Sequence, residues 1–538
     1  MPGQRNLNAG PAWTAERLRS WVAKRYGGES MVVLANREPF RHDRAADGGI
    51  VVNRTAGGLV TALEPLIHAC SGVWVAHGAG TADRAVVDEH DGIDVPLSQG
   101  RYRLRRVWLD AVEERGYYYG FANEGLWPLC HRTRIPAIFR ADDFKTYREV
   151  NARFAAAVCE EIKTESPLVL VQDYHFALAP RMIRRRLPQS AIISFWHIPW
   201  PQPSRFQACP MGRQLLIGLL GSSVVGFQTP DDCRHFIDTV GASIDAHIDR
   251  RRGLITYRGR ETKVRAHPVS VEWPSRVAAQ LPSVEACRAM IRRQLGLAPD
   301  VRLGVGVDRL DYTKGIIEKL LAVERLLERH PEHIGRFVFV QIAEPSRPCL
   351  PAYRALRAAM RQTADRINAR FGSGTGPILL LEDHWDPAEV YRFLRGADLC
   401  FVGSLHDGMN LVAKEFVAAR DDERGVLILS RFAGAARELS AALIVNPLDV
   451  DESAGALAHA LIMNHEQQAD RMRDMRAVVA EFNSYRWAAG MLADGAPSRR
   501  VVHRSADVHA MDRDQLPETL LLDRTQHPRE SFDHPPLR

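Results

Sequence analysis

The stretch that decides the fold runs from 399 to 418 and reads LCFVGSLHDGMNLVAKEFVA. It opens with a short, continuous apolar run, typical of a strand buried on both faces, and closes with apolar residues at helical spacing. The loop between them places a helix N-terminus at the carboxyl end of the strand. Free backbone N–H groups and the helix dipole favour an anion there. The stretch therefore predicts a parallel α/β sheet with an anion site at its edge.

The same alternation of apolar run, turn and helical pattern recurs along the 538 residues. In the first half the runs are MVVLANR (31–37), GVWVAHG (72–78), LVLVQDYH (168–175), AIISFWHIP (191–199) and SVVGFQT (223–229). In the second half they are VRLGVGVDR (301–309), RFVFVQIA (336–343), PILLLED (377–383), LCFVGS (399–404), GVLILS (425–430) and ALIVNP (442–447). Two successive sets of parallel strands predict two Rossmann-like, doubly wound α/β domains that face each other across an interdomain cleft.

A proline-rich segment without strand pattern, 264–287, separates the two sets, and we place the boundary near Val269. The predicted organisation has five parts: an N-terminal extension (1–30), a first Rossmann-like domain (31–268), a second (269–480), a final helix that returns to the first domain (481–495) and a disordered tail (496–538).

Composition excludes several classes of protein. Hydrophobic residues make up 46% and charged residues 25% of the chain, the values of a globular protein. Eight cysteines occur singly, and no apolar segment approaches 18 residues, so we expect a cytoplasmic protein without membrane contact. The net charge of +6 suits phosphorylated ligands or nucleic acid. The basic runs RMIRRR (181–186) and DRRRG (249–253) lack interleaved aromatic residues, so we expect no nucleic-acid partner.

Polar residues at predicted strand ends are the candidates for chemistry. In the second half, Arg309 and Lys314 suit a diphosphate, while Asp407 and Glu415 suit sugar and ribose hydroxyls. Each also has an ordinary explanation: Asp407 as a helix cap, Glu415 as a surface charge, and the two cations as surface residues.

In the first half, Arg37, Asp173 and His197 end strands, and the Gly57–Gly58 pair precedes a helix, where backbone can approach a phosphate. Single residues of this kind are often purely structural. No histidine or cysteine pattern has metal-ligand spacing, and we expect neither a metal nor a cofactor. The sequence leaves open whether the chain forms a homo-oligomer.

Taken together, the motifs resemble those of the trehalose-6-phosphate synthase family, retaining nucleotide-sugar glycosyltransferases with the GT-B fold. The resemblance runs from about Met31 to Trp487 and rests on motifs in the family's order: AGGL, GLWPLCH, QDYH, HIPWPQP, GFQT, DRLDYTKG, QIAEPSR, DGMNLVAKE and FAGAARELSAALIVNP. It implies transfer of glucose from UDP-glucose to glucose 6-phosphate, giving α,α-trehalose 6-phosphate and UDP. The family's mechanism is front-face attack without a protein nucleophile, and UDP-glucose is a substrate rather than a cofactor.

The resemblance also implies roles for individual residues. The donor would be bound by Gly57, Gly58, Arg309, Lys314, Trp385, Leu411, Val412, Ala413, Lys414 and Glu415. The acceptor would be bound by Arg37, Tyr118, Trp127, Asp173 and Arg347. The residues nearest the reaction would be Asp173, His197, Arg309, Lys314 and Asp407.

Two positions depart from the family's pattern: His406 stands where an arginine is usual, and Gln172 where a histidine is usual. Both adjoin ligand positions, so the nucleotide and the acceptor are less well determined than the fold. Two alternatives follow. One is a glucosylglycerol-phosphate synthase that uses ADP-glucose and glycerol 3-phosphate, and the other is a catalytically silent sugar-phosphate sensor on the same fold.

Overall fold

The computed structural model describes most of the chain between residues 12 and 496. The described residues are 12–27, 30–54, 60, 62–64, 66–67, 72–97, 100–372 and 375–496. Residues 1–496 form one compact unit. The tail expected to be disordered lies outside the described residues from 497 onward.

The first sheet has ten strands in the order β10-β11-β12-β9-β8-β7-β1-β4-β6-β5. Its strands are β1 (Met31–Arg37), β4 (Val73–His77), β5 (Gly92–Leu97), β6 (Gly100–Val107), β7 (Leu168–Gln172), β8 (Ala191–Phe195), β9 (Val224–Phe227), β10 (His247–Asp249), β11 (Leu254–Tyr257) and β12 (Arg260–Ala266). The central strands pair in parallel, whereas β5, β10 and β11 pair antiparallel at the two edges. A separate hairpin joins β2 (Phe40–Arg44) to β3 (Ile50–Arg54).

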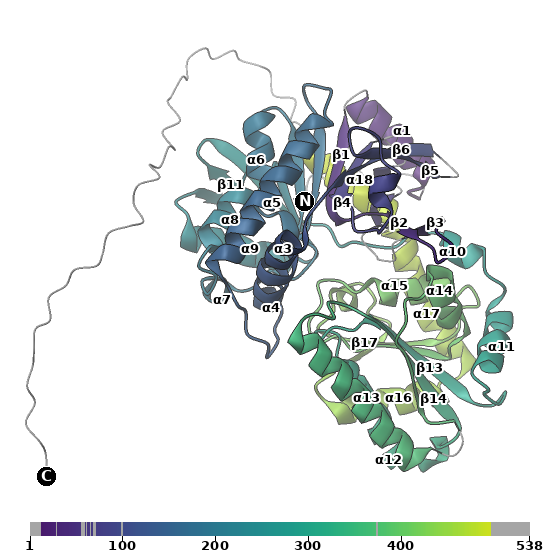
Figure 1. Ribbon diagram of the computed structural model, residues 1–538. Helices are drawn as coiled ribbons and strands as arrows, with labels where there is room; N and C mark the ends of the chain where they lie inside the picture. Colours follow the sequence, from purple (N-terminus) through teal and green to yellow (C-terminus); the bar gives the residue numbers. More distant parts are fainter. Residues whose placement is uncertain are drawn as a thin grey trace, which may run out of the picture. The chain divides into compact units, whose positions relative to one another are not determined.

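Helices cover both faces of this sheet, because successive residues of its central strands are apolar and point to opposite faces. In β1, Val33 and Ala35 join one buried cluster and Val32 and Leu34 join another on the opposite face. The main helices are α1 (Ala15–Tyr26), α5 (Ala141–Glu160), α6 (Ala179–Arg186), α8 (Gly212–Leu219), α9 (Pro230–Ser243) and α18 (Ser484–Gly495) (Figure 1). A π-helix, η2 (Arg115–Leu126), and α4 (Trp127–Cys130) form the aromatic segment between β6 and α5.

The second sheet is entirely parallel, in the order β15-β14-β13-β16-β17-β18. Its strands are β13 (Arg302–Arg309), β14 (Phe337–Glu344), β15 (Ile378–Leu381), β16 (Leu399–Val402), β17 (Val426–Ser430) and β18 (Leu443–Val445). Its helices are α11 (Val284–Gln294), α12 (Ile316–Arg329), α13 (Pro351–Phe371), α14 (Pro387–Gly396), α15 (Leu411–Ala419), α16 (Val450–Ile462) and α17 (His465–Glu481). The two sheets confirm the predicted doubly wound α/β class.

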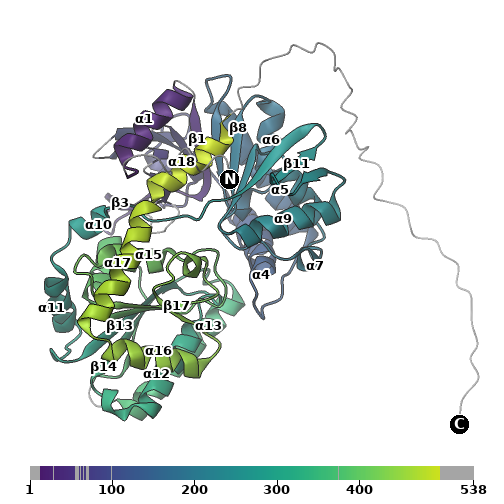
Figure 2. The same ribbon diagram turned by 180° about the vertical axis from the view of Figure 1, so that it is seen from behind.

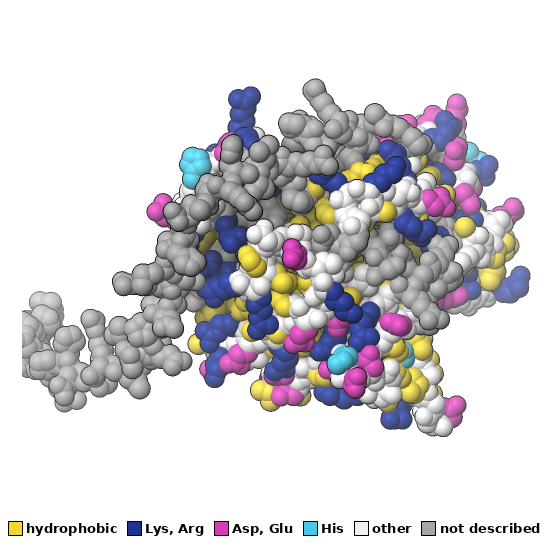
Figure 3. Space-filling view, turned by 90° about the horizontal axis from the view of Figure 1, so that it is seen from above, with side chains coloured by type: hydrophobic (Ala, Val, Ile, Leu, Met, Phe, Trp, Pro, Cys, Tyr) yellow, Lys and Arg dark blue, Asp and Glu magenta, His cyan; other side chains and the backbone are white. Residues whose placement is uncertain are grey.

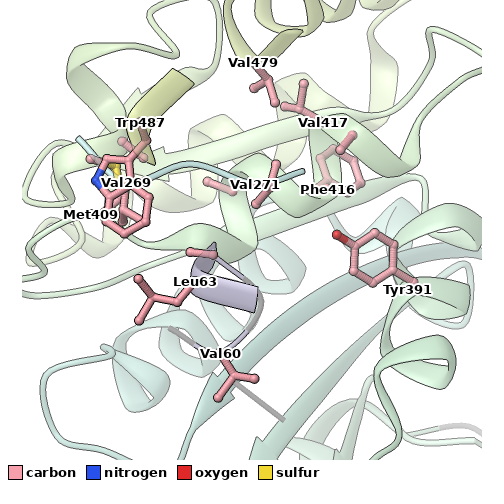
Figure 4. Close-up of a cluster of buried hydrophobic side chains, with 14 of the residues drawn as sticks. Val60, Leu63, Val269, Val271, Tyr391, Met409, Phe416, Val417, Val479 and Trp487 are labelled. Carbon is pink, nitrogen blue, oxygen red and sulfur yellow. The ribbon is translucent and has the colours of Figure 1, made fainter. Parts of the chain in front are cut away.

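The segment between the sheets is buried rather than loose. Val269 and Val271 pack with residues of the second domain and of α18 in one apolar cluster, which Figure 4 shows in close-up. Near the end of the described chain, α18 lies along the first sheet (Figure 2), where Trp487 Nε1 donates to the carbonyl of His267 at 3.1 Å and the ring packs edge-on against Phe195.

The surface has mixed charge. Lys and Arg side chains are interspersed with Asp and Glu over the face seen in Figure 3. Among the described residues, the structure contains no helix with the length and apolar character needed to cross a membrane.

Candidate active site

Two polar residues lie at the carboxyl ends of the adjacent strands β7 and β8. Asp173 follows β7 with φ 71° and ψ 174°, a conformation that residues other than glycine rarely adopt and that recurs at functional sites. Its Oδ1 accepts a hydrogen bond from the backbone N–H of His197 at 3.1 Å. Burial raises the pKa of the Asp173 carboxyl to about 6, although Arg309 and Arg347 oppose the change.

The His197 imidazole is held neutral. Burial lowers its pKa to about 3, and its Nε2 shares a 2.9 Å hydrogen bond with Oε1 of Gln172. Because a glutamine Oε1 only accepts, Nε2 carries the proton and Nδ1 keeps a lone pair. Gln172 is fully buried, and its amide nitrogen has no partner among the described residues.

In the second domain, Lys314 and Asp407 form an ion pair where β13 and β16 give way to loops. Asp407 also accepts hydrogen bonds from Ser404 Oγ and Asn410 Nδ2, each at 3.2 Å. Burial alone would raise the pKa of Asp407, but Lys314 holds it below its usual value. Asp407 is therefore a fixed anion next to a cation.

Helix α15 begins directly after this loop. Its N-cap is Asn410, whose Oδ1 accepts from the backbone N–H of Ala413 at 3.3 Å, so the ordinary explanation of Asp407 as the helix cap is wrong. Leu411 and Val412 are half-buried in the first turn. Glu415 is likewise not a surface charge: its side chain is half-buried, burial raises its pKa to about 7, and the carboxylate has no hydrogen bond to a described residue.

Lys414 differs from its neighbours in α15. Its ammonium is buried, donates to the Val269 carbonyl at 2.9 Å and forms an ion pair with Glu438. The structure therefore places this side chain in the join between α15 and the interdomain segment, where it anchors the helix.

Trp127 marks the point where residues of the two domains meet. The guanidinium of Arg347 lies 4.3 Å from its ring centre and that of Arg309 lies 5.5 Å away, both within cation–π range. Trp127 belongs to the first domain, whereas Arg309 ends β13 and Arg347 follows β14, both strands of the second. This contact unites three of the predicted ligand-binding residues.

Arg347 is fixed by a buried network. It donates to Asp311 Oδ2 at 2.8 Å and to the hydroxyl of Tyr174 at 3.3 Å, and it also contacts the hydroxyl of Tyr353. Asp311 is completely buried, yet the guanidinium groups of Arg347 and Arg309 overcome the effect of burial and hold its pKa near 2. Asp311 therefore orients the arginine.

Three arginines act on one phenol. Burial raises the pKa of Tyr118, but Arg347, Arg37 and Arg309 outweigh burial and bring it below its usual value. Arg37 is exposed at the end of β1, and the Tyr118 ring stacks on His175 with ring centres 5.6 Å apart. Such a concentration of positive charge suits a phosphate group.

For the remaining predicted donor-binding residues, the structure provides little information. Gly57 and Gly58 lie outside the described residues. Trp385, in the loop before α14, packs its ring edge-on against Phe393. No group of three or more His, Cys, Asp or Glu side chains suited to a metal ion occurs in the described part of the chain.

The loop that carries Asp407 also contacts the first domain. The backbone N–H of Arg132 donates to Nδ1 of His406 at 3.1 Å, so this nitrogen is unprotonated, and burial lowers the pKa of His406 to about 3. A Cβ on Gly408 would lie 2.4 Å from the His197 carbonyl, so only glycine permits this approach.

The site's supporting residues Asp311, Asn410 and His131 were not singled out from the sequence. Asp311 lies between the two cations of the quoted DRLDYTKG motif, and an acid in that position was the available signal. Asn410 lies in the quoted loop, but the sequence could not decide which polar residue of that loop, Asp407 or Asn410, caps the helix. Nothing in the sequence indicated His131, which is buried against Trp127.

Comparison with known proteins identifies the family. Residues 29–495 match glycosyltransferase family 20. The chain belongs to this family. The glycosyltransferase family predicted from the resemblance is thereby confirmed.

Relatives match this glycosyltransferase over nearly their whole length. It is 37% identical to the trehalose-6-phosphate synthase of Mycolicibacterium vanbaalenii over 87% of this chain and 96% of the relative. A chain from E. coli bound with UDP-2-fluoro glucose superposes with a TM-score of 0.76 at 31% identity, over 87% of this chain and 99% of the other. An α,α-trehalose-phosphate synthase (UDP-forming) from Burkholderia xenovorans, in complex with glucose-6-phosphate, gives a TM-score of 0.76 at 32% identity over the same shares.

Proposed function

We propose that this glycosyltransferase moves glucose from UDP-glucose to glucose 6-phosphate with retention at the anomeric carbon, giving α,α-trehalose 6-phosphate and UDP. The observation that carries the proposal is the contact of Arg309 and Arg347 with Trp127, since it brings a predicted donor residue and two predicted acceptor residues to one place. The relatives with a UDP-sugar analogue or glucose-6-phosphate bound support the same pair of substrates.

On the donor side, Arg309 and Lys314 would bind the diphosphate. Breaking the bond between glucose and phosphate places negative charge on UDP, so preplaced cations stabilise the transition state more than the ground state. Glu415 is half-buried, its carboxylate makes no hydrogen bond to a described residue, and it would accept from the ribose hydroxyls. Asp407 would accept from hydroxyls of the donor glucose.

On the acceptor side, the phosphate would lie among Arg37, Arg347 and Tyr118. Three guanidinium groups already lower the pKa of the Tyr118 phenol, and a dianionic phosphate would neutralise part of their positive charge. Trp127 would then lie against the acceptor sugar. These residues favour a phosphorylated acceptor over a free sugar.

Asp173 and His197 would position the sugars rather than form a covalent intermediate. His197 is neutral at physiological pH, so it hydrogen-bonds without supplying a charge. The proposed route is front-face attack, in which the departing phosphate takes the proton of the acceptor hydroxyl. A similar solved structure, of a trehalose-6-phosphate synthase studied for enzymatic glycosyltransfer with retention, supports the stereochemical outcome that this route would give.

The test is a panel of UDP-, ADP- and GDP-glucose against glucose 6-phosphate and glycerol 3-phosphate, with release of the nucleoside diphosphate as the readout. We expect the fastest release from UDP-glucose with glucose 6-phosphate, and almost none without an acceptor. Faster release from ADP-glucose with glycerol 3-phosphate would establish the glucosylglycerol-phosphate alternative. Binding without turnover for every pair would establish a silent sensor.

A further inference from the structure

A second group of cations lies at the opposite edge of the second sheet from the candidate active site. Arg302 begins β13, Asp398 directly precedes β16, and Arg424 lies just before β17. The proposed substrate residues follow the carboxyl ends of these strands, whereas this group lies at their amino ends. A ligand bound here would not overlap with either substrate.

In this region the Asp398 carboxylate forms ion pairs with three guanidinium groups. Arg288 and Arg292 lie 3.5 Å from Asp398, and Arg302 lies 3.3 Å from it. A single negative charge offsets only one of these cations. Burial lowers the pKa of Arg292, Arg288 and Arg302 add to the effect, and the carboxylates of Asp398 and Asp300 oppose it.

Arg292 also has unused donor capacity. Its Nη2 donates to the Val301 carbonyl at 2.9 Å, but its Nε is buried without a hydrogen-bond partner among the described residues. A buried N–H of a charged group without an acceptor is costly. The guanidinium thus retains a donor that an added anion with several oxygens would satisfy.

Of these arginines, Arg288 and Arg292 border a groove of about 600 Å³ that residues of α11 line, whereas Arg302 and Asp398 lie beside it and do not line it. Its cationic lining is Arg288, Arg292, Arg293 and Arg424, and its apolar lining is Val284, Ala289, Leu297 and Pro299. Two acids also line it: Glu285, and Asp422, which is already paired with Arg420. The volume is that of a small-molecule site, and the lining combines positive charge with apolar surface.

We propose that this groove is an anion site that binds the phosphoryl group of a small phosphorylated metabolite. Guanidinium groups match the oxygens of a phosphate in geometry and charge, and a phosphate dianion supplies the negative charge that Asp398 alone does not. The apolar residues of α11 and the following loop cover the carbon skeleton of the ligand. The site is separate from the reaction and would serve regulation.

The test is calorimetric titration of the full chain with inorganic pyrophosphate, in the presence of saturating UDP to occupy the donor cations. The test variant is Arg293→Gln with Arg424→Gln, because both side chains are exposed and neither forms an ion pair with a described residue, so the fold is retained. The matched control is Arg251→Gln with Arg252→Gln, which removes the same charge from an exposed turn of the first domain.

We expect the wild type and the control to bind pyrophosphate alike and the test variant to bind about tenfold more weakly or not at all. Added salt should weaken binding by the wild type. Equal affinity in the test variant and the wild type would overturn the proposal, as would an equal loss in the control or the absence of binding by the wild type. Arg292→Lys provides a second check, since it keeps the charge but removes the buried Nε donor, and it should also weaken binding.

Discussion

The variant Asp173→Asn measures how much free energy of unfolding the chain loses by holding the Asp173 carboxylate at the candidate site. The pKa of Asp173 is about 6 in the folded chain, raised from 3.8 mainly by burial. Between these two pH values the folded chain binds more protons than the unfolded chain, so the wild type loses stability as pH rises through this window. The difference corresponds to about 3 kcal/mol, and partial exposure of the side chain reduces the expected effect to about 1–2 kcal/mol.

Asparagine keeps the acceptor oxygen for the His197 N–H but carries no charge to bury. We therefore expect the variant to exceed the wild type in free energy of unfolding by about 1–2 kcal/mol at pH 8, with the advantage falling by about half at pH 5. The assay is denaturant unfolding at several pH values. Turnover should fall at the same time, because the proposed acceptor contact changes.

Asp494→Asn is the matched control. This carboxylate lies 3.1 Å from His267 Nε2, and although burial opposes the change, His267, Arg265 and Lys263 hold its pKa below the usual value. Its stabilising effect is present at neutral pH and lost in acid, so its amide variant should be less stable than the wild type at pH 8. If Asp173→Asn also destabilised the chain at pH 8, or if its effect did not vary with pH, the assigned cost of burial would be wrong.

Three further changes test other parts of the site. Arg309→Ala should reduce turnover in the UDP-release assay by ~100-fold or more, the scale expected for losing one charge that stabilises the transition state; an unchanged rate would remove Arg309 from the diphosphate site. Lys414→Met should lower the free energy of unfolding by about 3–5 kcal/mol in denaturant titration, because it leaves the Glu438 carboxylate without its buried partner; a neutral effect would contradict the anchoring role. Gln172→Glu should raise the pKa of His197 and introduce an acid limb into the pH–rate profile that Gln172→Leu lacks; identical profiles would mean that His197 need not be neutral.

Most of the parallel strands were predictable because they are continuous apolar runs, and each of these runs lies in a strand of one of the two sheets. The strands β6 and β12 also pair in parallel, but charged residues interrupt them and they were not predicted. The antiparallel strands were not predicted either. All five residues of β3 are exposed, and β10 has only three residues, so neither shows an alternation that a sequence pattern can detect. Their pairing depends on a neighbouring strand rather than on their own composition.

In the candidate site, too, some residues were predictable from local sequence, and others have roles that depend on residues distant in sequence. Asp173 and His197 were predicted because each directly follows an apolar run, and the structure joins them by a hydrogen bond. Gln172 was noticed only as a departure from the family's pattern, because a buried amide at the end of a strand gains its role from the imidazole that packs beside it. The burial of Lys414 likewise depends on Glu438, which is distant in sequence, so helical spacing alone could not indicate it.

The ion pair between Lys314 and Asp407 bears on how the donor site is prepared. In the proposed reaction the ammonium contacts the diphosphate, so it must exchange Asp407 for phosphate oxygens. This exchange does not leave the carboxylate without partners, because Asp407 keeps hydrogen bonds from Ser404 and Asn410. Each charge is therefore already desolvated and oriented before the donor binds, and little reorganisation remains when negative charge develops on the leaving group. A flexible lysine suits this exchange better than an arginine, whose planar fork would hold the carboxylate through two bonds.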